Sequence, residues 1–439
     1  MSILARYACL LVVLALGACD RDDEAAPAEP PLRAGLIELE VATFSEQPTL
    51  EAYVLPGQLT WAGYRTSDSL RGAAFAASRA ADGAWEVQRY ASEGSDRTDL
   101  RYLADGVLVA QGFDAGTGER LLHFGAGGSR RALSIDAERY RGIAAGRASA
   151  HGLLYWSRVD GERRLSWLPT GASTEVDLLT LPEDLARDLQ GVTADATTVY
   201  GVYRRQAYTP ATVTYVPFRF EVADPIGSYR EGDPYAARGA IAGQWNAPGV
   251  IGDGVYTLVE EHDRGLLRWT LPDLRGGVLE EVDGWAGAPR VDDHVSTVTY
   301  PDGRGRAFAE IEGGWRGSPV YELRPDGLRA LTGGRLDFVL PESDSVLSNA
   351  TAYRAEHFFR VFHAEAELVY LHNAYFVIAV DAATGETVAA WATAPTAQAL
   401  RERGHYLTDA RASDDSIYVA GVSSYGESGV DLLYAAFAK

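Results

Sequence analysis

Cysteine is almost absent from this chain of 439 residues, which contains two cysteines. Both of them, Cys9 and Cys19, lie near the N-terminus, so the sequence after Cys19 has no thiol at all. This excludes an intrachain disulfide from the main body of the protein. It also excludes thiol catalysis and thiolate metal sites there, because both need a cysteine sulfur.

Positive charge is also scarce. The chain has 40 Lys and Arg residues against 61 Asp and Glu residues, which gives a formal net charge of −21. This balance argues against a nucleic-acid partner, because phosphate binding needs a basic surface. Lysine occurs once, as Lys439, so every other basic side chain is an arginine. A GC-rich genome explains that bias, yet arginine also provides a planar fork that suits carboxylates and catecholates.

Recognised catalytic motifs are missing as well. The sequence has no Gly-x-Ser-x-Gly elbow, His-Glu-x-x-His pair, phosphate loop or EF-hand loop. Adjacent carboxylates such as Asp414 and Asp415 are interpreted as solvated turn residues, because neighbours on a strand point to opposite faces. His262, His357 and His363 are interpreted as surface or core residues, so we expect no metal and no cofactor. An enzyme is not the favoured class, although a hydrolase or lyase remains a third hypothesis.

One long hydrophobic run stands out. Ala8 to Leu16 is apolar throughout and follows the single charge of Arg6. It is shorter than the roughly 20 residues that cross a bilayer, and two small residues and Cys19 come after it. This order of charged, apolar and small residues is typical of a secretory signal.

The run Leu16-Gly17-Ala18-Cys19 resembles the lipobox of bacterial lipoproteins in all four positions. The resemblance implies cleavage before Cys19, a diacylglycerol on its sulfur and a third acyl chain on its new amino group. Three chains would anchor the protein firmly, since each buried CH₂ contributes about 0.8 kcal/mol. We therefore expect a lipid-anchored protein of the cell envelope. The periplasmic face of either membrane and the cell surface all remain open.

The expected domain organisation is simple. Residues 1–18 form the signal peptide, and residues 19–34 form the lipidated cysteine with an acidic, Pro/Ala-rich tether. That tether has almost nothing to bury and is predicted to be disordered. Residues 35–439 form one folded domain, which we expect to be monomeric.

Short apolar runs separated by Gly, Asp and Pro turns predict an all-β domain. One type of strand recurs about every 50 residues, which is the pattern of a β-propeller. Two copies, RRLSWLP (163–169) and GLLRWTLP (265–272), share a Trp and a Pro. The eight recurring strands centre on Phe75, Leu122, Ser166, Val216, Leu267, Tyr321, Val377 and Tyr434.

Eight blades are therefore predicted, with seven blades or a pair of β-sandwiches as the alternatives. The last repeat ends one strand short, and residues 36–44 are predicted to supply that strand and close the ring. Closure would remove exposed sheet edges. Helical turns are expected only at residues 183–190 and 396–403. The matching segments 113–124 and 380–391 are interpreted as Asp/Gly hairpin turns rather than as a cofactor motif.

Arginine and aromatic residues occur together in several segments predicted to be loops. One is the hairpin loop around 203–208, another is the connection 229–245, and two more surround His262 and Arg354. In a propeller these loops would converge on one face and form a mouth suited to an anionic aromatic ligand. The alternative is that these arginines neutralise nearby carboxylates in a rigid rim. The predicted ligand-binding residues are Arg204, Arg205, Tyr208, Tyr235, Arg238, Trp245, His262, Arg264, Arg354 and His357.

The function predicted from these observations is binding of a ligand by a lipid-anchored propeller. The layout is similar to that of propeller lipoproteins that accompany siderophore receptors, which implies capture of a ferric siderophore and a part in iron transport. A protein–protein scaffold in the envelope is the second hypothesis. The expected partners are thus the membrane, through the lipid anchor, and either a small anionic aromatic ligand or an envelope protein.

Overall fold

A computed structural model describes most of the chain after residue 39. Within the described residues the fold is all-β, and its one helix is the single turn α3 (Pro225–Ser228). No helix in this part of the chain is long and apolar enough to cross a bilayer. The described residues are 40–44, 47–64, 72–90, 98–103, 106–111, 121–125, 128–133, 146–182, 186–208, 211–237, 249–260, 264–280, 295–296, 307–311, 320–324, 327–331, 359–374, 376–391, 405–423 and 430–439.

The described strands form separate antiparallel sheets, and neighbours in sequence are neighbours in a sheet. In the first half of the chain, the first sheet consists of β2 (Gln47–Leu55), β3 (Gln58–Tyr64), β4 (Gly72–Arg79) and β5 (Trp85–Tyr90), and the next of β6 (Thr98–Leu103), β7 (Gly106–Gln111), β8 (Leu121–Gly125) and β9 (Arg130–Leu133). The sheet that follows consists of β10 (Arg147–Ser149), β11 (Gly152–Val159), β12 (Glu162–Pro169) and β13 (Val176–Pro182). The last sheet of this half consists of β14 (Ala186–Ala194), β15 (Thr198–Tyr208) and β16 (Ala211–Glu221), with β17 (Arg230–Glu231) and β18 (Tyr235–Ala237) both paired to β16.

The second half continues in the same way. Its sheets comprise β19 (Gly249–Ile251), β20 (Gly254–Glu260), β21 (Arg264–Thr270) and β22 (Arg275–Glu280); β23 (Val295–Ser296), β24 (Ala307–Ile311), β25 (Val320–Arg324) and β26 (Gly327–Ala330); β27 (Arg360–Ala364), β28 (Leu368–His372), β29 (Val377–Asp381) and β30 (Thr387–Ala390); and β31 (His405–Ala412), β32 (Ser416–Ser423) and β33 (Val430–Ala438), joined by β1 (Glu40–Phe44).

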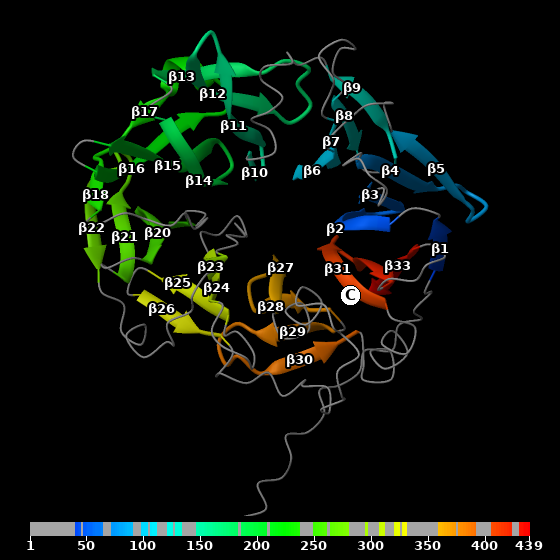
Figure 1. The fold of residues 1–439 in the computed structure, drawn as a ribbon. Helices are drawn as coiled ribbons and strands as arrows, with labels where there is room; N and C mark the ends of the chain where they lie inside the picture. The colour runs from blue at the N-terminus through cyan, green and yellow to red at the C-terminus, as the bar shows by residue number, and fades with distance from the viewer. Residues whose placement is uncertain are drawn as a thin grey trace, which may run out of the picture.

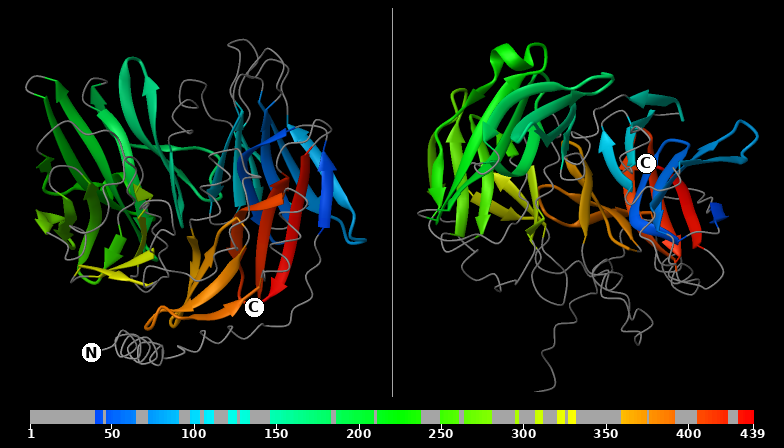
Figure 2. Two further views of the ribbon diagram at one scale, coloured as in Figure 1. Left: turned by 60° about the horizontal axis from the view of Figure 1, so that its bottom comes forward. Right: turned by 45° about the horizontal axis from the view of Figure 1, so that its top comes forward.

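These sheets follow one another around a ring, as Figure 1 shows and the two views of Figure 2 confirm. The first strand of each sheet lies nearest the centre. Each sheet contacts the next along the chain, and β2 of the first sheet contacts β31 of the last. The centre of the ring is therefore bordered by first strands from different sheets.

The recurring strands found in the sequence occupy equivalent places in the structure. The segments around Phe75, Leu122, Ser166 and Val216 are β4, β8, β12 and β16, each the third strand of its sheet. The later segments are β21, β25, β29 and β33, which are also third strands. Trp167 and Trp269, the shared tryptophans, both lie on third strands and are completely buried.

Residues 40–44 pair with the last sheet, as predicted for the N-terminal strand. β1 runs antiparallel to β33 from Glu40 opposite Tyr434 to Phe44 opposite Val430. It is the outer strand of a sheet whose inner strand is β31. The first and the last described strands of the chain thus belong to one sheet.

The hydrophobic core lies between neighbouring sheets. Leu154 and Trp167 of one sheet and Val199 and Phe218 of the next belong to one buried cluster. Trp167 meets Phe220 edge-on, with ring centroids 5.2 Å apart. Because each such cluster lies between consecutive sheets, burial of apolar side chains stabilises the order of the sheets around the ring.

Two local predictions were wrong. Residues 186–190, expected to be helical, are part of β14, whose pairing with β15 shifts register twice between Ala186 and Gly191. The period-two pattern of residues 356–363 predicts a strand with Val361 and His363 on one face and Phe362 on the other. That alternation fails, because the register of β27 shifts between Val361 and His363 and leaves both Val361 and Phe362 buried. Residues 396–403 and 113–120 lie outside the described residues, so those predictions are not tested.

Candidate functional site

The predicted loop around Arg204 and Arg205 is a strand in the structure. β15 continues to Tyr208 and pairs with β16 along its whole length, Arg204 opposite Tyr215 and Arg205 opposite Thr214. The last register pair of the two strands is Tyr208 opposite Ala211. Placing the two arginines in a loop was therefore wrong, and the strand pairing changes what their side chains can do.

Arg205 belongs to a compact polar group at this end of the sheet. Its guanidinium forms an ion pair with Glu231 at 3.0 Å and donates to the Tyr203 hydroxyl. The Tyr203 hydroxyl donates to Glu231 Oε1 at 2.5 Å, and Tyr229 donates to the same oxygen at 3.3 Å. Burial and the adjacent carboxylate raise the pKa of both tyrosines, which keeps them protonated as donors. For Arg205 this is the rigid-rim arrangement, in which the arginine charge is balanced within the protein.

The other predicted ligand-binding residues lie in several different environments. Arg204 is only 8% exposed, and Tyr235 packs against the buried cluster that contains Trp269. Both therefore help to build the fold rather than form an open mouth. Tyr208 and Arg264 lie in β15 and β21, but their side chains are outside the described set. The remaining residues, Cys19, Arg238, Trp245, His262, Arg354 and His357, lie outside the described residues.

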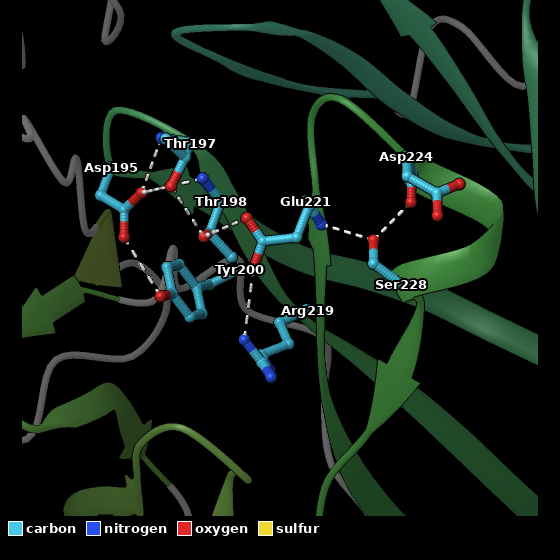
Figure 3. Close-up of polar contacts among 8 residues, drawn as sticks. All are labelled: Asp195, Thr197, Thr198, Tyr200, Arg219, Glu221, Asp224 and Ser228. Atoms are coloured by element: carbon cyan, nitrogen blue, oxygen red, sulfur yellow. Dashed lines mark hydrogen bonds and ion pairs between the residues drawn. The ribbon is translucent and has the colours of Figure 1, made fainter.

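A second polar network holds the opposite end of the same sheet (Figure 3). The Asp195 carboxylate accepts hydrogen bonds from the backbone of Thr197 and Thr198 and from the Tyr200 hydroxyl. These bonds close the turn between β14 and β15, and they lower the pKa of Asp195 against the opposing effect of burial. After β16 ends at Glu221, Ser228 of α3 donates to the Asp224 carbonyl and accepts from the Glu221 backbone. This network stabilises the turns that follow β14 and β16.

The Asp/Gly hairpin turn predicted within residues 380–391 has the expected structural role. The Asp381 carboxylate accepts from the backbone of Ala383 at 2.8 Å and of Thr384 at 2.7 Å. Gly385 has φ of 76°, a conformation that side-chain-bearing residues rarely adopt. The motif is thus explained by the hairpin itself.

The imidazole of His363 contacts the C-terminal residue, Lys439. Its Nε2 lies 3.2 Å from the Lys439 amine, which also forms an ion pair with Glu365 at 2.5 Å and donates to the Ser413 carbonyl at 2.9 Å. Burial, together with the lysine charge, lowers the pKa of His363. Within the part of the chain that the structure describes, no group of three or more His, Cys, Asp or Glu side chains is placed to hold a metal ion.

Sequence reasoning missed a cluster of charged and titratable residues on the inner strands β27 and β31 and on β28, the strand beside β27. We call Arg360, His372, Asp409 and Arg411 the inner-strand cluster. Arg360 begins β27 and is exposed, His372 lies opposite it on β28, and β31 of the next sheet carries Asp409 and Arg411. Asp409 Oδ1 pairs with Arg411 at 3.2 Å, while Oδ2 accepts from the Val54 backbone at 2.9 Å.

The electrostatics of the inner-strand cluster are dominated by burial and by arginine. Burial, assisted by the charges of Arg360 and Arg411, lowers the pKa of His372 to about 3, so this imidazole is neutral at physiological pH. Burial raises the pKa of Asp409 although Arg411 and two backbone N–H groups favour its ionised form. The cluster combines two guanidinium groups, one neutral imidazole and one carboxylate. Its local charge is thus positive in a chain that is strongly acidic overall.

Comparison with known proteins gives fold-level likeness only. No family model matches the chain, and no curated protein matches it. Among solved structures, the chain is similar to an acylaminoacyl peptidase of Pyrococcus horikoshii at 8% identity and a TM-score of 0.42, covering 88% of this chain and 51% of that one. The chain therefore spans about half the length of that peptidase.

Two further solved structures have comparable similarity. The β-propeller domain of the Trilobed protease from Pyrococcus furiosus matches at 9% identity and a TM-score of 0.41, covering 78% of this chain and 93% of that domain. TolB from Acinetobacter baumannii matches at 11% identity and a TM-score of 0.31, covering 62% and 63%. All of these TM-scores are below 0.5, so the architecture of this chain rests on its own strand pairing.

Proposed function

We propose that this chain is an eight-bladed β-propeller that is anchored to the bacterial envelope and binds an anionic ligand on one face of its ring. The observation that carries the proposal is the cyclic order of the sheets, with the first strand of each nearest the centre. In such a ring the ends of the inner strands converge on a common face. Propellers use that face to bind molecules at or near the central axis.

The anionic class of ligand follows from the side chains at this centre. The inner-strand cluster places two guanidinium groups against one carboxylate, both of whose oxygens already have partners. Guanidinium groups bind carboxylates, phosphates and catecholates through paired hydrogen bonds and stack on aromatic rings. A ferric catecholate siderophore combines negative charge with aromatic rings and is the specific ligand we propose.

The binding test is calorimetry on the full-length chain purified in detergent, titrated with a ferric tris-catecholate. We expect saturable heat that the metal-free catechol does not reproduce at the same concentration. If no heat of binding is seen with either compound, the small-ligand proposal is wrong.

A scaffold that docks an envelope protein is the second candidate. The internal pairing of Arg205 with Glu231 favours it, since this arginine is already engaged and belongs to a preformed rim. Crosslinking in the intact envelope separates the candidates. A scaffold gives the same crosslinked partner at high yield with or without ligand, whereas a capture protein also binds the ferric catecholate in isolation.

Envelope anchoring through Cys19 is part of the proposal and is supported by the lipobox. Cys19→Ser removes the sulfur that would carry the diacylglycerol. We expect this variant to keep its signal peptide and to lack acyl chains, so its intact mass should equal that of the full unmodified sequence. Recovery of the native protein with an unmodified Cys19 would disprove the anchor.

A further inference from the structure

The start of strand β27 brings together two groups that the framework leaves available. The side chain of Arg360 is exposed and, within the described residues, makes no ion pair or hydrogen bond, although its charge acts on His372 and Asp409. Its register partner on β28 is His372, which is 6% exposed. The Nδ1 atom of His372 is buried and has no hydrogen-bond partner among the described residues. A buried polar atom without a partner costs roughly 1–3 kcal/mol, so the Nδ1 atom of His372 is a feature that needs explanation.

Among the described residues, no ion pair joins Arg360 to a carboxylate in the way that Glu231 pairs with Arg205. The charge of Arg360 favours the ionised form of Asp409. The direct contacts of Asp409, however, are with Arg411 at 3.2 Å and with the Val54 backbone at 2.9 Å. The one carboxylate of the inner-strand cluster thus serves two guanidinium groups, and its ion pair is with Arg411.

We infer that Arg360 and His372 form an oxyanion subsite at the start of the inner strand β27, which takes a carboxylate or phosphate group. This inference deepens the proposed function and rests on it, because it names the residues that would hold the negative end of the ligand. The guanidinium supplies charge and two parallel N–H donors. The neutral imidazole supplies one further donor or acceptor at Nδ1, depending on the tautomer.

The position of the subsite suits a protein that repels anions elsewhere. The formal net charge of −21 disfavours the approach of an anion at long range. At physiological ionic strength, however, the Debye length is about 8 Å, so distant carboxylates are screened and the local guanidinium dominates. An oxyanion is thus favoured where arginines outnumber carboxylates, as they do in the inner-strand cluster, where Arg360 and Arg411 face the single carboxylate of Asp409.

The test uses the full-length chain in detergent with three variants: Arg360→Gln, His372→Gln and the control Arg275→Gln. Arg275 is an exposed arginine on the outer strand β22, where it pairs with Asp273 at 3.6 Å. Calorimetry is run with inorganic phosphate, with citrate and with a ferric tris-catecholate. Phosphate and citrate distinguish the two sources of oxyanion, and circular dichroism confirms that each variant is folded.

We expect phosphate or citrate to bind the wild type and the Arg275→Gln variant equally. Arg360→Gln should bind the same anion about ten- to a hundred-fold more weakly, which is the effect of one charge-assisted hydrogen bond. His372→Gln should weaken binding less, because the glutamine amide retains a donor and an acceptor.

Two outcomes would overturn the subsite. One is a wild type that binds neither phosphate nor citrate, and the other is an Arg360→Gln variant that binds as tightly as the wild type. If the ferric catecholate still binds in those cases, the proposed function stands and only the location fails. If phosphate or citrate binding depends on Arg360 but the ferric catecholate does not bind, the subsite stands and the proposed ligand is wrong.

Discussion

Asp409 is the side chain that ties the last sheet to the first. Its carboxylate accepts a hydrogen bond from the Val54 backbone on β2 across a separation of 355 residues in the sequence. The same interface includes a hydrogen bond of 3.0 Å from the Gly57 backbone to the Tyr434 hydroxyl and an edge-on contact of Trp85 with Tyr434. Interactions between residues this distant in sequence constrain the ring as a whole.

Replacement of this carboxylate should therefore be costly. Asp409→Ala removes the acceptor of the Val54 N–H and breaks the ion pair with Arg411, whose side chain is 17% exposed. We expect a loss of about 3–5 kcal/mol in the free energy of unfolding, which is typical when one partner of a buried pair is removed. The matched control is Asp414→Ala in an exposed turn, which should change stability by about 0.5 kcal/mol or less. Denaturant unfolding measures both, and equal effects would show that Asp409 does not hold the interface.

His372 should make the protein sensitive to acid. Its pKa lies at about 3 in the folded protein, below the ordinary value of 6.5, so the unfolded state binds a proton more readily. The stability that this neutral imidazole provides is complete above pH 6.5 and is lost as the pH falls towards 3. Between pH 6.5 and 5 we expect a loss of about 2 kcal/mol from this group.

The measurement is the free energy of unfolding at pH 7.5, 6 and 5 for the wild type and for His372→Gln. The variant should lose clearly less stability over this range than the wild type does. The raised pKa of Asp409 works in the opposite direction, since a folded-state carboxyl that binds protons more readily gains stability as the pH falls. A variant with the same pH slope as the wild type would contradict the assignment to His372.

At this scale the sequence predicted residue types better than residue positions. Arginine beside aromatic rings was expected, and Arg205 does lie beside Tyr203, with its guanidinium 5.3 Å from the ring centroid. The error arose because β15 is longer than its pattern suggests, which turns an expected loop into a paired strand. The inner-strand cluster could not be predicted from the sequence, because its members come from strands that become neighbours only when the ring of sheets forms.

At the scale of strands, periodicity was a strong predictor. All eight recurring segments are third strands, because each of them must be apolar enough to pack between neighbouring sheets. The helical turn expected at 183–190 failed for the opposite reason. Residues 186–190 have local helical character, but pairing with β15 decides their conformation, as tertiary context commonly does.

The N-terminal strand offers a test at this scale. Deletion of residues 36–44 removes β1, so β33 loses its partner along five register positions. We expect a loss of several kcal/mol and aggregation, because an exposed edge strand pairs readily with other chains. Thermal unfolding and light scattering measure the two effects.

Deletion of residues 20–32 is the control for that experiment. This acidic, Pro/Ala-rich segment is predicted to be a tether and should leave the melting temperature nearly unchanged. Similar behaviour of the two deletions would show that β1 is dispensable for the fold.

At the scale of the whole molecule, the first described strand and the C-terminal residues meet in one sheet and its neighbour. β1 completes the sheet that contains β33, while Lys439 contacts His363 and Glu365 of the preceding sheet. The only lysine of the chain thus joins two consecutive sheets. A ring built from many similar sheets has one place where non-covalent contacts must join the last sheet to the rest. Here β1 pairs with β33 on one side, and Lys439 contacts the preceding sheet on the other.

The most direct test of ring closure by the N-terminal strand is therefore an engineered disulfide between β1 and β33. Thr43 and Asp431 are register partners, and paired residues in antiparallel strands have Cα atoms about 4.5–5.5 Å apart, within the range for a disulfide. With Cys9→Ser and Cys19→Ser in the background, Thr43→Cys plus Asp431→Cys should oxidise readily and lose about 2 Da, as expected for one disulfide. The control, Thr43→Cys plus Ser157→Cys, should remain reduced. A first pair that stays reduced in the folded protein, or a control that oxidises equally well, would contradict closure of the ring by the N-terminal strand.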